Sequence, residues 1–176
     1  KKILKNEFKN KNFLLRTGLC GHGDKSSLNK SNFVLSLKMM SKMSRINRSR
    51  NIITVEAGAM LFDLTVYLKK NGYFIFNVPG GKNVSLGGAI SGNVHGRFSS
   101  KKFANFGDNI ESLKIINEKG KIKSLKKNSN LFNRVIGGQS SFGIIVEATL
   151  KVNKIRSYIF IEKKTFIKNL KEFKKF

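Results

Sequence analysis

The amino-acid sequence predicts an α+β fold in which strands outnumber helices. Short apolar runs bounded by Gly, Asn, Asp and Ser recur along its 176 residues, which is typical of buried strands separated by turns. One segment, residues 60–72, instead has a clear helical period. The chain is 40% hydrophobic and contains 15 Phe, so it is long and apolar enough to bury a core.

The first half of the chain is expected to contain strands around this one helix. The runs predicted to be strands are residues 12–16, 32–37, 51–58 and 73–80. Within residues 60–72, Leu61, Leu64 and Leu68 fall on one helical face, and an Asn-Gly pair follows as a C-terminal stop. This segment is therefore predicted to be an amphipathic helix.

The second half is expected to contain a hairpin, a short helix and a final strand. Residues 110–125 hold two runs of alternating apolar residues on either side of a Glu-Lys-Gly turn, which is typical of a β-hairpin. Residues 130–138 end in two glycines, as a short helix often does. Residues 142–152 are predicted to be a strand.

A run of small residues between 77 and 96 points to a ligand. It holds six of the 16 glycines, the only Pro and one of the two His. Such a cluster indicates either positive φ angles or close approach of a ligand to the backbone. We expect its glycines to offer unobstructed N–H groups, and Ser85 and Ser91 their hydroxyls, to a phosphate.

A second glycine-rich segment, residues 16–27, follows the first expected strand. Two such loops could together hold a pyrophosphate. The sequence contains neither a G-x-x-x-x-G-K-[ST] motif nor a G-x-G-x-x-G motif that opens a helix after the first strand. The remaining inference is that the chain binds a dinucleotide by neither a P-loop nor a Rossmann motif.

The charge of the chain raises a second functional hypothesis, a basic binding module rather than an enzyme. Lys and Arg number 35 against 10 Asp and Glu, a net charge of +25, so a basic module for nucleic acid or anionic lipid is conceivable. The lysines, however, are scattered through every segment and accompany abundant Asn, Ile and Phe, as an AT-rich genome would produce. No arginine stripe with interleaved aromatic residues is present.

The numbers of cysteines and histidines indicate the cellular compartment and whether a metal site is expected. One Cys excludes an internal disulfide, and no apolar run is long enough for a membrane span, so a cytoplasmic setting is expected, with peripheral membrane contact left open. No metal site is expected, because the two His, one Cys and ten acids show no ligand spacing. Both ends of the chain look cut, so a fragment is expected.

Several motifs in a fixed order resemble the FAD-binding domain of the vanillyl-alcohol oxidase, or PCMH, type. They are VPGGKNVSLGGAISGNVHG, FANFGDNIESL and VIGGQSSFGIIVEATL, preceded by GLCGHGDKSS and ITVEAGAMLFDL. The nearest likeness is to decaprenylphosphoryl-ribose oxidases and aldonolactone oxidases. The resemblance implies two small α+β subdomains with FAD between them, formed by residues 1–152 without a first strand, and the start of a truncated substrate domain in residues 153–176.

The resemblance also assigns residues to the cofactor. Residues 18–24 would hold the pyrophosphate together with Gly80 and residues 85–88, residues 92–95 would run beside the isoalloxazine, and Ile145 would lie near the adenine. The full set is Gly18, Leu19, Cys20, Gly21, His22, Gly23, Asp24, Gly80, Ser85, Leu86, Gly87, Gly88, Gly92, Asn93, Val94, His95 and Ile145. His22 could bond covalently to the flavin or be an ordinary loop histidine, and both remain open.

The implied activity is oxidation of a sugar or sugar-derived alcohol by hydride transfer to flavin. Either a decaprenylphosphoryl-ribose-oxidase-like or a D-arabinono-1,4-lactone-oxidase-like reaction fits. His95 would orient or deprotonate the hydroxyl, because imidazole can exchange protons near neutral pH. Arg97 would hold a phosphate or polar sugar group through its planar donors. The expected partner is therefore a small carbohydrate-type molecule rather than a specific nucleic acid.

Overall fold

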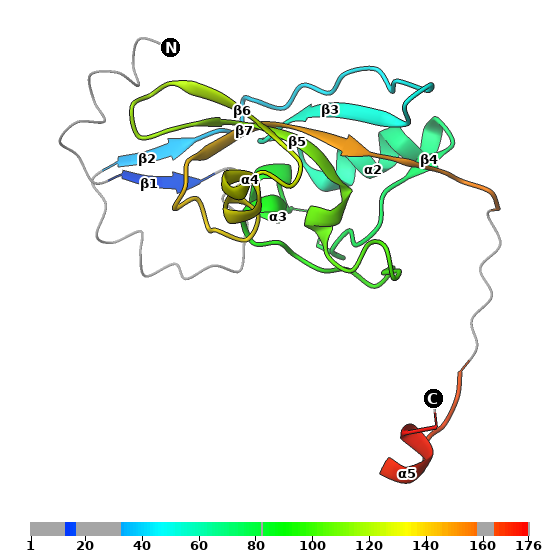
Figure 1. Cartoon of the computed structure of the whole chain (residues 1–176). Helices are drawn as coiled ribbons and strands as arrows, with labels where there is room; N and C mark the ends of the chain where they lie inside the picture. Colours follow the sequence, from blue (N-terminus) through cyan, green and yellow to red (C-terminus); the bar gives the residue numbers. More distant parts are fainter. Residues whose placement is uncertain (1–12, 17–32, 82, 158–163, 176) are drawn as a thin grey trace.

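A computed structural model of the chain describes residues 13–16, 33–81, 83–157 and 164–175. Its centre is a four-stranded antiparallel sheet with the strand order β3-β7-β5-β6 (Figure 1). The strands are β3 (Ile52–Glu56), β5 (Ile110–Ile116), β6 (Ile122–Lys126) and β7 (Ile144–Lys151). The last of these four strands in sequence, β7, therefore lies between β3 and β5, and its buried residues join the two halves of the chain.

Two small sheets flank this centre. Strands β1 (Phe13–Arg16) and β2 (Phe33–Ser36) are parallel. Strands β4 (Tyr73–Phe74) and β8 (Asn153–Lys154) are antiparallel, and the Ile155 N–H donates to the Gly72 carbonyl at 2.9 Å. The domain boundary expected at residue 152 stays a prediction, and strand pairing continues for two residues past it.

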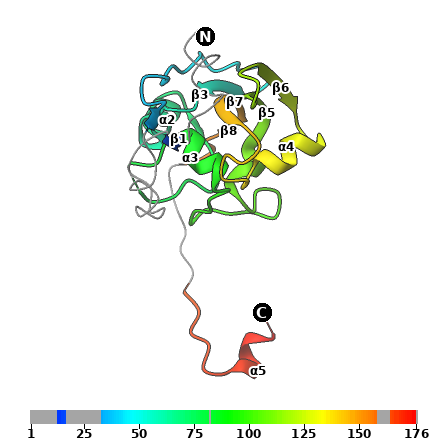
Figure 2. The same cartoon turned by 90° about the vertical axis from the view of Figure 1, so that its left-hand side faces the viewer.

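The helices are short apart from the first of them. They are α2 (Leu61–Lys70), α3 (Leu86–Ser91), the 3₁₀ turn η2 (Phe106–Asn109), α4 (Asn130–Val135) and α5 (Leu170–Phe173). In both views α3 and α4 lie on the same side of the four-stranded sheet (Figures 1 and 2). The three leucines predicted on one face of α2 are all buried, so the amphipathic pattern correctly identified the face of α2 that packs on the core.

Most of the predicted elements are confirmed. The structure has strands within 12–16, 32–37, 51–58 and 142–152, the hairpin of β5 and β6, and helices within 60–72 and 130–138. The α+β class is confirmed as well. Gly120 in the hairpin turn has φ +68°, a conformation that glycine adopts without a Cβ penalty.

The strand predicted over residues 73–80 is wrong beyond Phe74. Asn77 has φ +58°, in the left-handed region, so the chain cannot continue in an extended conformation there. Side chains replace the missing ladder bonds: the buried Asn109 amide donates to the Phe76 carbonyl at 3.0 Å, and its oxygen accepts from the Phe76 N–H at 3.3 Å. Phe76 also stacks on Phe103, with centroids 4.8 Å apart.

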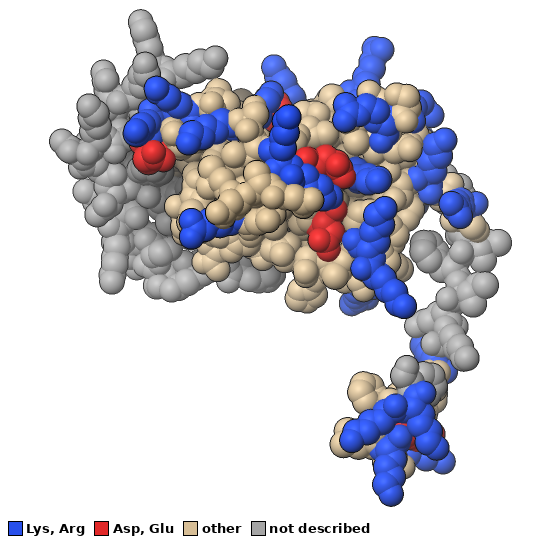
Figure 3. Space-filling view, in the orientation of Figure 1, with Lys and Arg blue, Asp and Glu red and all other residues tan. Residues whose placement is uncertain are grey.

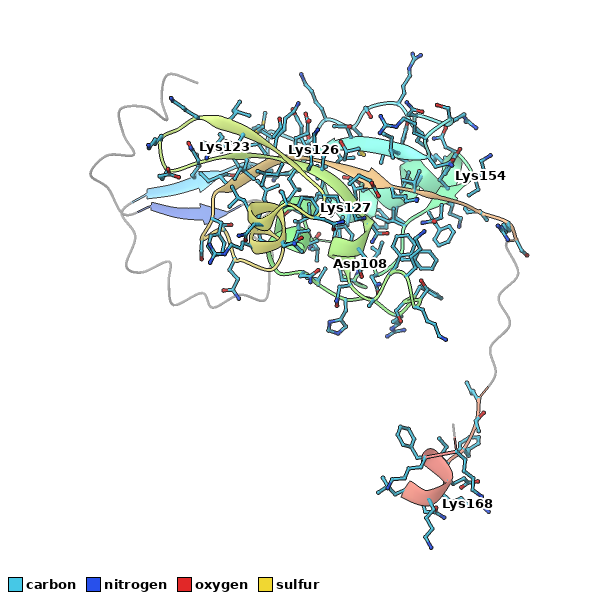
Figure 4. The ribbon with its side chains drawn as sticks, viewed as in Figure 1. Asp108, Lys123, Lys126, Lys127, Lys154 and Lys168 are labelled. Atoms are coloured by element: carbon cyan, nitrogen blue, oxygen red, sulfur yellow. The ribbon has the colours of Figure 1, made fainter. Side chains whose placement is uncertain are left out.

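A lysine ties the end of β6 to η2. Lys127 Nζ donates to the Asp108 carbonyl and pairs with Glu111 Oε1, both at 3.3 Å. Figure 4 labels Lys127 and Asp108, which lie close together in that view. This contact holds η2, and with it the segment around residue 107, against the sheet.

Candidate functional site

The N-terminus of α3 lies where three distant parts of the sequence meet. The Gly87 N–H donates to the Ala57 carbonyl at 2.8 Å, and the Ala57 N–H donates to the Val146 carbonyl at 3.0 Å. Ala57 directly follows β3, and Val146 lies in β7. The structure thus brings the predicted residues 85–88 and the strand that carries Ile145 to the same end of the sheet.

Gly58 lets the chain that leaves β2 approach this point. A Cβ on Gly58 would collide with the Leu37 carbonyl oxygen and would lie 2.8 Å from the Met40 carbonyl oxygen. The Gly58 N–H donates to that same Met40 carbonyl at 2.8 Å. Only glycine fits this backbone contact, so the exit of β2 is fixed beside residues 57–59.

The expectation that the glycine run offers free N–H groups is wrong for most of it. Residues 86–91 form helix α3. The Gly88 N–H donates to the Ser85 hydroxyl at 3.3 Å, and the Gly92 N–H donates to the Gly88 carbonyl at 3.0 Å. With the bond from Gly87, these donors are used within the protein. Here the small residues instead allow close packing, because Ser85, Leu86 and Gly87 are all buried.

Gly80 differs from the helical glycines because it remains open. It is exposed, and among the residues that the structure describes a Cβ placed on it would meet no atom within 4 Å. Its backbone can therefore be approached by a ligand. Gly80 is the part of the predicted phosphate-binding segment that fits a bound cofactor most directly.

The C-terminal end of α3 packs on two turns. Asn93 has φ +40°, and its Oδ1 accepts from the Gly107 N–H at 3.0 Å. The Gly137 N–H donates to the Ile90 carbonyl at 3.0 Å. A Cβ on Gly107 would lie 2.8 Å from Asn93 Oδ1, so η2 packs closely against the Asn93 side chain at the end of α3.

His95 and Arg97 are both exposed and lie on the loop that follows. Val94, just before them, is fixed by two backbone bonds: its carbonyl accepts from the Phe106 N–H at 2.9 Å, and its N–H donates to Ala89 at 3.1 Å. The loop therefore leaves the core at a defined point, and its two predicted catalytic side chains are accessible to a substrate.

The remaining predicted site residues divide between the described and undescribed parts of the chain. Ile145 is buried at 2% exposure and pairs with Ile115 across β5 and β7, next to a bulge in that ladder. The predicted pyrophosphate loop, residues 18–24 with Cys20 and His22, lies outside the described residues. Sequence reasoning missed Asn77, Ala57 and Asn109, because their partners are distant in sequence and no local motif marks them.

The described residues contain no group of three or more His, Cys, Asp or Glu placed to hold a metal ion. In the same part of the chain, no helix is long and apolar enough to cross a membrane. Basic side chains are spread over the face seen in Figure 3. Those on β6, such as Lys123 and Lys126, stand on an edge strand, where lysine commonly prevents pairing with another chain.

The family model described as "FAD binding domain" matches residues 5–126, which is more than half of the chain. The chain belongs to this family, its cofactor is FAD, and the resemblance to the PCMH type is confirmed. Open backbone at Gly80 and the closely packed turns around Asn93 are compatible with a nucleotide cofactor at this end of the sheet.

Similar proteins are oxidases by their names. Decaprenylphosphoryl-beta-D-ribose oxidase of Mycolicibacterium smegmatis is 26% identical over 143 residues, covering 80% of this chain and 31% of that protein. D-arabinono-1,4-lactone oxidase of Debaryomyces hansenii is 29% identical over 148 residues, covering 81% and 26%. The chain thus spans about a third or less of the length of these relatives.

Two solved structures have a fold similar to that of this chain. A variant of Phl p 4, described as a glucose oxidase, superposes with a TM-score of 0.69 at 25% identity, covering 82% of this chain and 30% of that one. Alkyldihydroxyacetonephosphate synthase superposes with a TM-score of 0.72 at 22% identity, covering 87% and 29%. At that identity the second likeness concerns the fold alone.

Proposed function

We propose that this chain is the cofactor-binding part of an FAD-dependent oxidoreductase that oxidises an alcohol carbon of a sugar or sugar-derived substrate. Its membership of the FAD binding domain family carries the proposal. The names of relatives support the substrate class, since they include oxidases of a prenylphosphoryl ribose and of an aldonolactone. A single cysteine in the chain is compatible with a reducing, cytoplasmic setting.

Two reactions compete within this class. A decaprenylphosphoryl-ribose-oxidase-like reaction is supported by the 26% identity to that enzyme over 80% of this chain. An aldonolactone-oxidase-like reaction is supported by the 29% identity to a D-arabinono-1,4-lactone oxidase over 81% of it. The two substrates differ in charge: the first carries a phosphodiester and the second is neutral.

We assign the residues the roles that the resemblance to the family implies. Residues 18–24 and Gly80 bind the FAD pyrophosphate, and residues 85–88 support that loop from helix α3. Residues 92–95 lie along the ring system, and Ile145 supports the adenine end from β7. For Gly87, Gly88 and Gly92 the role is close packing against the cofactor-binding loops, because their N–H groups are already bonded.

Bound FAD would supply the group that accepts a hydride from the alcohol carbon. His95 accepts the hydroxyl proton or holds the hydroxyl in place, which its exposed position allows. Arg97 binds a phosphate or sugar oxygens with its guanidinium donors. The loop that carries both side chains is fixed by the hydrogen bonds of Val94 and Gly96. The substrate groups that His95 and Arg97 bind are therefore held at a fixed position in the site.

Anaerobic reduction of the flavin tests this function in the full-length protein. The trial substrates are a short-chain prenylphosphoryl ribose, D-arabinono-1,4-lactone, L-galactono-1,4-lactone, glucose and D-lactate. We expect one of the sugar-derived compounds to bleach the flavin absorbance, and heat-denatured protein with the same FAD to remain coloured. Bleaching by D-lactate alone would reject the sugar class in favour of a 2-hydroxy acid.

A further inference from the structure

Asn77 holds the loop that carries His95 and Arg97. It is fully buried at 0% exposure. Its backbone N–H donates to the Phe98 carbonyl at 2.9 Å, its side-chain Nδ2 donates to the Phe103 carbonyl, and its Oδ1 accepts from the Gly96 N–H at 3.4 Å. One residue therefore binds the loop at its beginning, its middle and its end.

Gly96 brings the loop into direct backbone contact with Asn77. A Cβ on Gly96 would collide with the Val78 carbonyl oxygen and would lie 2.6 Å from the Asn77 carbonyl carbon. Nothing larger than glycine fits there without moving one of the two backbones. The residues on either side of Gly96 are His95 and Arg97, so this contact sets where both side chains begin.

Asn77 is itself anchored to the sheet. The neighbouring Phe76 has both backbone groups bonded to the amide of Asn109, which is buried and directly precedes β5. The Phe76 ring stacks on Phe103 at 4.8 Å, next to the carbonyl that Asn77 binds. Rigid contacts thus run from β5 through residues 76 and 77 to the loop.

The backbone of Asn77 favours asparagine for a second reason. At φ +58° most side chains are strained by about 1–2 kcal/mol, whereas Gly and, to a lesser degree, Asn adopt this conformation readily. A change to Gly is therefore compatible with this backbone conformation and removes the side chain together with its two hydrogen bonds. This makes Asn77→Gly a selective probe of the amide.

We propose that Asn77 is a positioning residue, which holds His95 at the face of the bound flavin. The inference rests on the proposed function, because it assigns His95 a place beside the cofactor. It adds that this placement depends on the Asn77 amide, whose two side-chain bonds fix Gly96 and Phe103. Without the amide, the loop would sample other positions, and misplacement by about 1 Å can cost about 10²-fold in rate.

The test follows the ring signal of His95 by NMR in full-length holoprotein labelled with ¹³C-histidine. Dithionite reduces the flavin without any substrate, and a His95→Ala spectrum assigns the signal. In the wild type we expect the His95 signal to shift when the flavin is reduced. In Asn77→Gly most of that shift should be lost, although FAD remains bound.

Asn51→Gly is the matched control. Asn51 has nearly the same backbone conformation, φ +52°, and lies before β3, away from the loop. Its buried Oδ1 has no hydrogen-bond partner in the described part of the chain. The same substitution there should leave the response of His95 unchanged. Where Asn77→Gly fails to retain FAD, Asn77→Asp is the second variant: it keeps the acceptor for Gly96, loses the donor to Phe103, and should lose part of the shift.

Three outcomes of the NMR experiment support or reject the proposed role of Asn77. Loss of the shift in the Asn77 variant, with the Asn51 variant normal, supports the proposal. A wild-type response in the Asn77 variant overturns it and leaves the proposed function standing. A wild-type His95 signal that ignores flavin reduction removes His95 from the flavin, and both the role of His95 and that of Asn77 are then rejected.

Discussion

At the scale of single residues, His95 is the side chain on which the proposed chemistry depends. It is exposed, and it follows a valine fixed by two backbone bonds. We predict that His95→Ala retains FAD and slows flavin reduction by substrate by about 10²–10⁴-fold, the range for a lost acid–base or positioning group. Rapid-mixing absorbance measures this rate. Lys101→Ala, an exposed change later in the same loop, should reduce at the wild-type rate, and equal rates in all three proteins would contradict the role.

Arg97 is expected to act in binding rather than in the chemical step. Its guanidinium is exposed two residues after His95, where it can hold an anionic or polar group of the substrate. Arg97→Ala should therefore raise KM several-fold with kcat nearly unchanged. Steady-state kinetics over a range of substrate concentrations measures both constants. A fall in kcat at constant KM would instead place Arg97 in the transition state.

The sequence indicated His95 and Arg97 but not the residues that hold them. His95 ends an unusual glycine run, which drew attention to it without any structure. Asn77 acts through partners 19 to 26 positions away, and Asn109 through one 33 positions away. Their functions arise only when the chain folds back on itself, so no local pattern could have revealed them.

At the scale of elements, the contribution of helix α3 to FAD binding can be measured with helix α4 as the comparison. Ser85 caps α3 by accepting from Gly88 at 3.3 Å, and Ser129 caps α4 by accepting from Phe132 at 3.4 Å. Each change to Ala should lower the free energy of unfolding by about 1 kcal/mol. Only Ser85→Ala should also weaken FAD binding, because α3 packs at the candidate site.

Urea unfolding and FAD dissociation measure these two effects in parallel. Comparable FAD affinity in the Ser85 and Ser129 variants would show that α3 has no part in holding the cofactor. The two helices are each six residues long, so the loss of a cap is compared in helices of equal length.

Helix α3 also marks where element prediction failed. The sequence predicts a loop at Leu86–Ser91, because clustered glycines indicate turns or close approach of a ligand, and glycine also disfavours a helix by about 1 kcal/mol relative to alanine. Tertiary bonds outweigh this preference, since the Leu86 and Gly87 N–H groups donate to the carbonyls of Ala59 and Ala57. By contrast, α2 was predictable because its three buried leucines follow the helical period.

At the scale of the whole molecule, the fold is expected to work without a metal. The chain has two His, one Cys and ten acids, and the described residues form no group suited to a metal ion. Dialysis against a chelator should therefore leave the FAD content and the thermal unfolding midpoint unchanged. Stoichiometric zinc or iron in the purified protein, found by elemental analysis, would refute this.

The order of the sheet brings distant parts of the described chain together. Because β7 lies between β3 and β5, residues near 57, 87 and 146 meet at one end of the sheet. The FAD-family motifs made this class of fold predictable from the sequence. The bond that occupies the Gly87 N–H could not be predicted, because its partner, the Ala57 carbonyl, lies 30 positions away in the sequence.

Binding of FAD is the central claim, and the absorbance spectrum of the purified full-length protein tests it most directly. We predict flavin bands that correspond to nearly one FAD per chain, with the colour restored by added FAD after it has been stripped. A colourless protein that takes up no FAD on reconstitution, while its circular dichroism shows that it is folded, would contradict the account.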